Sequence, residues 1–465
     1  MPSASPTTSE PLPVLTAETT QRLTARWFAL LAVLMAGLAI GGRGFAYIGL
    51  PPLIISEIML ALGAMTFLIQ PRWRETLSQP LALMILLMLG WALMRTLPYL
   101  GQWKLDAIRD FMLLGYMATA LMVAAVVMSQ PQLLPWLLSK YQLFAKVFLC
   151  VMPPLWLIDQ AISDDAMPTW PWADHVGIIT LKPGDMPVHL GGIAALSIVG
   201  LFRGKSIVWT LLLCVLLGVA GAVSRGGLMA FSLAFGMAFL MRPRSAWATR
   251  LAIIMTVVVT LAAVSDVSVQ VPGRSREFSA QQLLLNVVTI FDDGEAAGDL
   301  DDTKTWRLEW WETIYDYTIF GEYFWTGKGF GVNLASDDGF QVFLVSESLR
   351  SPHNGHLNVL ARAGVPGFVL WCSILAVWCW TLLSAYLQAR QRGDTNWAMF
   401  FVLLVAYWTA LTFNAAVDVY FEGPMGGVWF WAVTGLGFSA AWVYRHHPEV
   451  MNVPHAWPRE TTEDD

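Results

Sequence analysis

One polar segment, SPHNGHLNVLARAGVPG, precedes an apolar run and carries residue types that acid–base chemistry needs. The Ser-Pro pair that opens it predicts a helix start. His353, Asn354 and His356 then fall in or near the first turn, where free backbone donors and the helix dipole suit an anion. A histidine there can exchange a proton near neutral pH. The two histidines could instead form a metal pair or line a polar vestibule. Arg362 follows at a predicted membrane depth, where a charge is costly and marks a functional site.

A second segment, TWRLEWWETIYDYTIFGEYFWTGKGFG, places an arginine beside an aromatic face. The guanidinium of Arg307 could hold an anionic headgroup, because its fixed fork matches phosphate oxygens two at a time. The other interpretation is an aromatic anchor with a snorkelling arginine. Trp311 follows four residues after Arg307. The apolar residues of this segment recur at helical spacing and predict a helix at the membrane interface: Trp306, Trp310, Ile314 and Tyr317.

Two glycine-containing motifs complete the candidates. Arg225 lies in AVSRGGLMAF, where two glycines would let another group approach the backbone. The alternative is an arginine that ends a helix at the interface. The GKGFG motif at 327–331 forms a tight turn, but it lacks GxxxxGK[ST] and does not favour a nucleotide site.

The composition requires a membrane to position these residues. Of 465 residues, 56% are hydrophobic and only 13% are charged, against about 25% charged in soluble domains. A soluble multidomain enzyme is therefore excluded. The net charge of −6 argues against a nucleic-acid partner, which would require a basic face. The chain is predicted to be an all-α polytopic protein of the lipid bilayer.

Apolar length predicts about twelve transmembrane helices, since a span needs about 20 apolar residues. The first apolar run is interpreted as a retained anchor rather than a cleaved signal. The predicted spans are 27–42, 45–69, 80–97, 111–129, 143–162, 188–202, 206–223, 227–241, 249–265, 357–386, 397–417 and 424–444.

Basic residues fix the predicted orientation, because Lys and Arg remain on the cytoplasmic side of short loops. They predict that both termini are cytoplasmic and that the one long connection faces outside. The predicted domains are a disordered cytoplasmic N-terminus at 1–25, nine transmembrane helices within 26–265, a periplasmic loop at 266–353, three helices within 354–445 and a cytoplasmic tail at 446–465.

The metal-ligating residue types give weaker signals. An acidic run at 292–302 could bind Ca²⁺ or Mg²⁺, but its spacing matches no known metal loop and favours a solvated segment. We predict no metal site and no cofactor. The four cysteines lie inside apolar runs and are interpreted as small buried residues: Cys150, Cys214, Cys372 and Cys379.

Together these motifs resemble the O-antigen ligase and O-antigen polymerase superfamily of bacterial membrane glycosyltransferases. The resemblance is carried by SRGGL around Arg225, by the Arg-x-x-x-Trp of Arg307 and Trp311, by GKGFG and by PHNGHLNVLARAGVPG. It is specific over 305–370 and elsewhere rests on span count and hydropathy. The N-terminal FAYIGLPPLIISEIML is also similar to members that act in polysaccharide export or polymerisation.

The resemblance implies a C-type glycosyltransferase architecture in the bacterial inner membrane, with the active site on the periplasmic face. It implies transfer of a glycan from undecaprenyl pyrophosphate to a hydroxyl acceptor, without metal or nucleotide. By position, Arg225 and Arg307 would bind the donor pyrophosphate and His353 would act at the acceptor hydroxyl. Asn354, His356, Arg362 and Trp311 would support them.

Several alternatives stay open at this point. A polymerase would use a second lipid-linked glycan as acceptor, and a ligase would use lipid A–core; the N-terminal similarity favours the polymerase or exopolysaccharide branch. A polysaccharide-lipid transporter would also use buried charges, although no inverted repeat of interrupted helices is visible. A metal-dependent transferase would use the acidic run and would be inactivated by EDTA.

Overall fold

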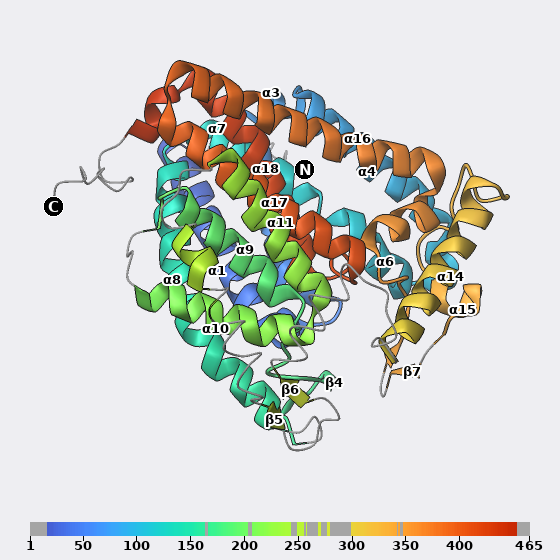
Figure 1. Ribbon diagram of the computed structural model, residues 1–465. Helices are drawn as coiled ribbons and strands as arrows, with labels where there is room; N and C mark the ends of the chain where they lie inside the picture. The colour runs from blue at the N-terminus through green and yellow to red at the C-terminus, as the bar shows by residue number, and fades with distance from the viewer. Residues whose placement is uncertain are drawn as a thin grey trace, which may run out of the picture.

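The computed structural model describes residues 16–162, 166–202, 207–242, 249–254, 257, 268–270, 277–279, 299–341, 343–344 and 347–452. Within these ranges the protein is almost entirely helical (Figure 1). The described strands form four antiparallel two-stranded hairpins: β1 (Gly49–Leu50) with β2 (Leu53–Ile54), β3 (Thr169–Trp170) with β4 (Ala173–Gly177), β5 (Ser268–Gln270) with β6 (Glu277–Ser279), and β7 (Phe343–Leu344) with β8 (Glu347–Ser348).

The described helices follow the apolar pattern of the sequence, because only a helix satisfies its own backbone in lipid. They are α1 (Ala17–Ala46), α2 (Ile55–Leu68), α3 (Trp73–Leu77), α4 (Pro80–Thr96), α5 (Leu100–Trp103), α6 (Leu105–Gly115), α7 (Ala118–Ser129), α8 (Leu133–Ala161), α9 (Asp185–Ile198), α10 (Ile207–Val223), α11 (Arg225–Met241), α14 (Asp299–Ile319), α15 (Leu334–Asp338), α16 (Gly355–Arg392), α17 (Thr395–Val417) and α18 (Pro424–His446).

Six of the described helices are long and apolar enough to cross a membrane, and a bent pair, α6 with α7, would make a seventh. Three further apolar helices, α2, α10 and α11, are shorter than a usual span. Eleven of the twelve predicted spans overlap described helices, although α2 begins only at Ile55 within the predicted span 45–69; most of the twelfth, 249–265, lies outside the described residues. The protein is therefore an all-α membrane protein, and the number of twelve spans stays a prediction.

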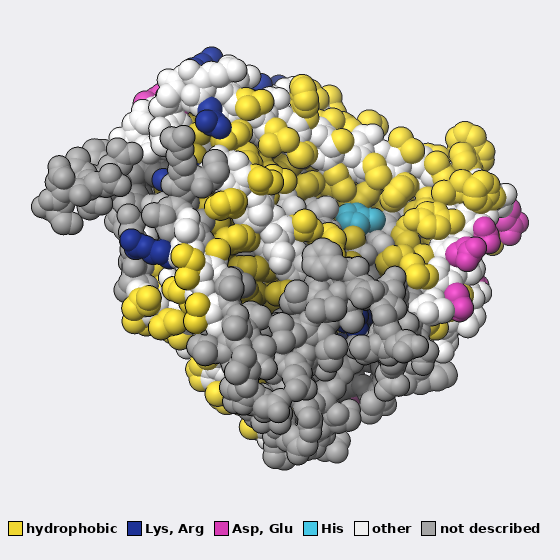
Figure 2. All heavy atoms as spheres, in the orientation of Figure 1, with side chains coloured by type: hydrophobic (Ala, Val, Ile, Leu, Met, Phe, Trp, Pro, Cys, Tyr) yellow, Lys and Arg dark blue, Asp and Glu magenta, His cyan; other side chains and the backbone are white. Residues whose placement is uncertain are grey.

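The centre of the bundle is formed by the last two helices. The apolar 18-residue stretch of α18 is entirely buried inside the protein, whereas only 28% of the corresponding stretch of α16 is buried. Small residues let the neighbours approach closely: a Cβ at Gly435 of α18 would come 2.4 Å from the Ala120 carbonyl oxygen of α7. The outer helices expose apolar side chains, and Figure 2 shows them spread over the described surface.

A lobe built on α14 and α15 packs against the beginning of α16 (Figure 1). The helix predicted from the aromatic spacing is confirmed. Its apolar face, however, contacts protein rather than the membrane interface, since Trp310 and Ile314 are fully buried in a cluster with Leu357 and Leu360 of α16. In Figure 2 most of the acidic side chains in view lie on this lobe.

Three other predictions need correction or comment. Helix α1 begins at Ala17, inside the stretch predicted to be disordered, because the Thr16 side chain caps it by accepting from the Thr19 N–H. Cys150 and Cys372 are exposed rather than buried, since apolar residues on the outside of a membrane bundle can face lipid. The acidic residues at 292–295 lie outside the described residues, as do the side chains of 299–302.

Candidate active site

The loop that carries His353 connects the α14–α15 lobe to α16. Asn354 is the N-cap of α16, and its Oδ1 accepts from the backbone N–H groups of His356 and Leu357, both at 3.0 Å. His353 has a positive φ of 53°, in the left-handed region that histidine adopts more often than most residues. Asn354 thus fixes the helix start, and the turn before it positions the imidazole.

A carboxylate from elsewhere in the chain lies beside His353, and an amine pairs with that carboxylate. Asp418 follows the last residue of α17, and its Oδ1 is 3.7 Å from the Nδ1 of His353. Its Oδ2 is 3.0 Å from the Nζ of Lys182. Burial raises the pKa of Asp418, but Lys182 and His353 outweigh it and hold that pKa well below its usual range. The carboxylate therefore stays charged at any pH near neutrality.

Arg307 reaches the same place from α14. Its Nη1 donates to the carbonyl of Val417 at 3.1 Å, directly beside Asp418. Burial lowers the pKa of Arg307, and the charge of Asp418 opposes that shift. The indole N–H of Trp311 donates to the carbonyl of Pro352 at 2.8 Å, so α14 is attached to the His353 loop.

Arg225 is the first residue of α11, after Ser224, whose hydroxyl accepts from the Gly227 N–H. The two following glycines allow close packing: a Cβ at Gly226 would come 2.7 Å from Val417, and one at Gly227 would come 2.9 Å from the Gly184 carbonyl. The start of α11 therefore touches the same residue, Val417, that accepts from Arg307. The structure brings the Arg225, Arg307 and His353 segments together at the end of α17.

His356 lies deeper and its ring is fully engaged. Its Nδ1 accepts from the indole N–H of Trp371 at 3.0 Å, so its proton lies on Nε2, which is 3.1 Å from the carbonyl of Thr412. Both ring nitrogens are used inside the bundle, which is the role of a structural histidine. His356 and His353 do not form the metal pair that their spacing allowed.

Arg362 supports the site from within α16. Its side chain is 2% exposed, and its Nη1 is 3.0 Å from the Oδ2 of Asp110 in α6. The same Nη1 donates to the carbonyls of Gly329 and Val332. Arg362 therefore holds the GKGFG turn in place. The lysine of this turn, Lys328, pairs with Asp337 and Asp338, so the turn does not form a phosphate loop.

A carboxylate that sequence reasoning missed links this arginine to the His353 loop. The Nε of Arg362 donates to Asn358 at 2.9 Å, and Asn358 Nδ2 donates to Glu422 at 2.8 Å. Glu422 also accepts from the hydroxyl of Ser351 at 2.7 Å. This network positions Ser351, which lies two residues before His353.

Replacing Arg362 with alanine is expected to destabilise the protein by about 3–5 kcal/mol, because it removes one of the arginines that pair with Asp110 and leaves the carbonyls of Gly329 and Val332 without this donor. Thermal unfolding of the purified protein in detergent measures this. Arg109→Ala is the control, since Arg109 is half exposed and pairs with Asp106 at 3.2 Å, which is worth at most about 1 kcal/mol. Equal midpoints for the two variants would contradict the structural role of Arg362.

If His353 acts at the acceptor hydroxyl, as the sequence resemblance implies, replacing Asp418 with asparagine is expected to lower turnover about a hundredfold. A unit charge about 4 Å from an imidazolium is worth a few kcal/mol at the dielectric typical of a protein surface. The effect should appear in kcat and not in KM for the donor, and Asp418→Glu should recover part of it. A variant that keeps full kcat would show that Asp418 only stabilises the fold.

The sequence comparisons agree with this geometry. Residues 209–372, about a third of the chain, match the family model described as O-antigen ligase. This part of the chain is similar to the O-antigen ligase family. The matched range includes Arg225, Arg307 and His353, and it confirms the resemblance to the O-antigen ligase and polymerase superfamily. No curated protein matches the chain in a sequence search.

The match to the O-antigen ligase model and the apolar helices support a multi-pass membrane protein with a glycosyl-transfer function on lipid-linked glycans. Lys182, Asp418 and Glu422 lie outside the matched range. Asp418 was visible in the sequence as a charge at the end of an apolar run, but neither apolar length nor spacing connects it to a histidine 65 positions earlier.

Proposed function

We propose that the protein transfers a glycan from undecaprenyl pyrophosphate to a hydroxyl acceptor, polymerising lipid-linked repeat units of an O-antigen or exopolysaccharide. The observation that carries the proposal is the convergence of the segments of Arg225, Arg307 and His353 at the end of α17. In this proposal both termini are cytoplasmic, the membrane is the bacterial inner membrane, and the site faces the periplasm.

The proposed reaction is a displacement at the anomeric carbon of the donor. The acceptor oxygen forms the new bond, the bond from carbon to the pyrophosphate oxygen breaks, and the electron pair leaves with the pyrophosphate. His353 takes the hydroxyl proton, and the Asp418 carboxylate stabilises the resulting imidazolium. Arg225 and Arg307 stabilise the charge that develops on the leaving group.

These guanidinium groups supply the positive charge that a divalent cation would otherwise provide. The proposal therefore requires no metal. It differs in this respect from a transferase that would use the acidic run.

Trp306 is the aromatic side chain best placed to contact a sugar. Its ring centre is 6.2 Å from that of His353, and it is only partly buried. Trp310 is fully buried, and its indole N–H donates to the carboxylate of Asp338. The indole N–H of Trp311 donates to the carbonyl of Pro352. We propose that a sugar of the donor or acceptor stacks on Trp306.

Replacing Trp306 with leucine is expected to raise KM about two- to tenfold, since an aromatic contact contributes about 0.5–1.5 kcal/mol beyond its buried area. Trp306→Tyr should retain most of the affinity. Steady-state assays with varied donor and acceptor show which substrate is affected. An unchanged KM for both substrates would exclude Trp306 as a sugar platform.

The experiment that tests the proposed function uses purified full-length protein, an undecaprenyl-pyrophosphate oligosaccharide and EDTA throughout. Products are separated on a gel with and without added lipid A–core. The matched variants are His353→Ala and His446→Ala, the second at the far end of α18. A ladder from donor alone, lost only in His353→Ala, is expected for a polymerase.

The other outcomes discriminate the alternatives. Product that requires lipid A–core would indicate the ligase. Activity that EDTA removes and Mg²⁺ restores would indicate the metal-dependent transferase. No product from folded protein with its native donor would overturn glycosyl transfer and favour a lipid transporter.

A further inference from the structure

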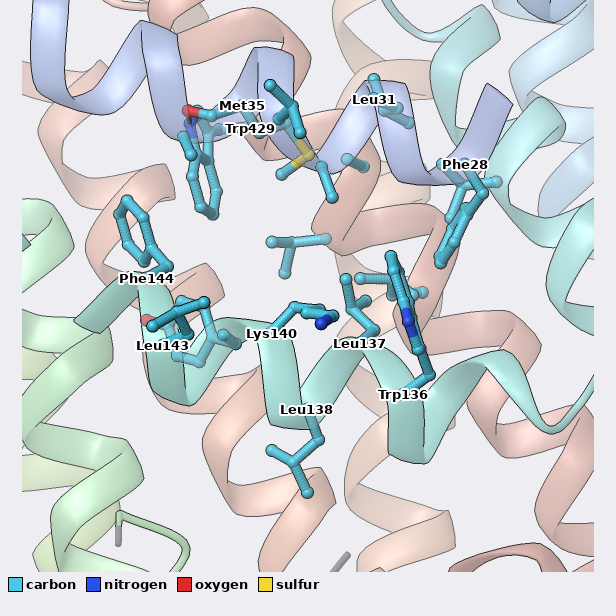
Figure 3. A pocket seen from close by; sticks show the side chains of 18 of the residues that line it. Phe28, Leu31, Met35, Trp136, Leu137, Leu138, Lys140, Leu143, Phe144 and Trp429 are labelled. Carbon is cyan, nitrogen blue, oxygen red and sulfur yellow. Dashed lines mark hydrogen bonds between the residues drawn. The ribbon is translucent and has the colours of Figure 1, made fainter. Parts of the chain in front are cut away.

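An apolar groove of about 470 Å³ opens between α1 and α8, with α17 and α18 as its floor (Figure 3). Two aromatic contacts close its ends: Phe28 with Trp136, ring centres 6.1 Å apart, and Phe144 with Trp429, 5.6 Å apart. Its volume is that of a typical ligand pocket, about 300–1,000 Å³. Among the described residues that line it, Lys140 alone is charged.

The groove faces the hydrocarbon of the bilayer. Val33 of α1 and Leu143 of α8 line it and are 67% and 57% exposed. Both helices are long enough to span the membrane. An opening between them at this depth meets lipid rather than water, so a hydrocarbon chain is the chemistry that fits.

Lys140 lies at the face of the membrane opposite the candidate active site. Near the other end of α8, Asp159 accepts from the backbone N–H of Leu181 at 3.3 Å, and the next residue, Lys182, pairs with Asp418. The helical rise of about 1.5 Å per residue separates Lys140 from Asp159 by about 28 Å. This is close to the hydrocarbon thickness of about 30 Å.

We propose that the groove binds an acyl chain of an anionic phospholipid from the leaflet opposite the active site, with the lipid phosphate at Lys140. The ammonium lies 5.8 Å from the ring centre of Trp136 and is exposed, as an interfacial anchor for a headgroup should be. The donor lipid fits poorly here, because in the proposed function its pyrophosphate belongs with the arginines on the other face. The inference goes beyond the proposed function, and its choice of leaflet and its exclusion of the donor rest on that function.

The test is photocrosslinking of full-length protein in nanodiscs that contain phosphatidylglycerol with a diazirine on one acyl chain. Mass spectrometry locates the adducts. We expect them on residues 28–40 of α1 and 136–147 of α8. Lys140→Glu and Val33→Trp, which remove the charge and fill the opening, should each reduce these adducts about tenfold.

Lys146→Glu is the matched control. It lies on the same helix, with its Nζ 6.0 Å from the ring of Phe202, and it does not line the groove; its labelling should equal that of the parent protein. Size-exclusion chromatography confirms that each variant is folded.

Three outcomes would overturn the proposal. Equal labelling by a zwitterionic phosphatidylethanolamine probe would exclude a preference for an anionic headgroup. Stronger labelling by a polyprenyl-phosphate probe, with displacement of phosphatidylglycerol, would assign the groove to the donor. Phosphatidylglycerol adducts that are absent from both segments would exclude a lipid site there.

Discussion

Replacing His353 with alanine is expected to lower glycan transfer about 10²- to 10⁴-fold, the usual contribution of a general base. The reason is geometric: His353 is 3.7 Å from Asp418, in the part of the fold where the Arg307 and Arg225 segments meet. Donor binding should change little, because the two arginines proposed to hold the pyrophosphate remain. Single-turnover assays with labelled donor separate the chemical step from binding.

The control for His353→Ala is His446→Ala, whose activity should match the parent protein. A variant at position 353 that keeps more than a tenth of the single-turnover rate would contradict the assignment of the base. Loss of donor affinity with an unchanged rate would instead make His353 a binding residue.

Replacing Arg307 with lysine is expected to lower kcat about 10²- to 10³-fold, as loss of a donor to developing charge does in other enzymes. Lysine keeps the charge but loses the planar fork that bonds two phosphate oxygens at once. It also loses the guanidinium that donates to the Val417 carbonyl and aligns α14 with α17. Arg307→Ala should be at least as severe.

Arg109→Lys provides the comparison for Arg307→Lys, because Arg109 lies on α6 and pairs only with nearby carboxylates in the described structure. It should leave kcat unchanged. An Arg307→Lys variant with parental kcat would show that a point charge is sufficient at this position, or that the donor pyrophosphate lies elsewhere.

The sequence predicted the helices because apolar length is a sufficient signal in lipid. It failed where a local interaction decided the outcome. Thr16 starts α1 early, and the prolines of the β1–β2 hairpin delay the start of α2 to Ile55. The spacing of the aromatic residues of α14 predicted the helix correctly. It predicted contact with the membrane interface where the helix packs on protein, since the same apolar face can contact either.

The candidate site was only partly predictable. His353 and the two arginines carried a motif, so residue type and spacing were enough to select them. Asp418 and Lys182 belong to no motif. They join the site only because the fold brings Asp418 close to His353 and Lys182 close to Asp418. Arg362 was selected because a charge in the bilayer is costly, yet that cost is offset by Asp110 and by backbone carbonyls rather than by a substrate.

The most direct test of the account is the structure of the His353→Ala variant with a bound undecaprenyl-pyrophosphate oligosaccharide, determined by electron cryomicroscopy in EDTA. We predict that the pyrophosphate contacts the guanidinium groups of Arg225 and Arg307 beside Val417, with the anomeric carbon facing position 353. A pyrophosphate bound at another face of the bundle, with both guanidinium groups out of reach, would contradict the proposed site.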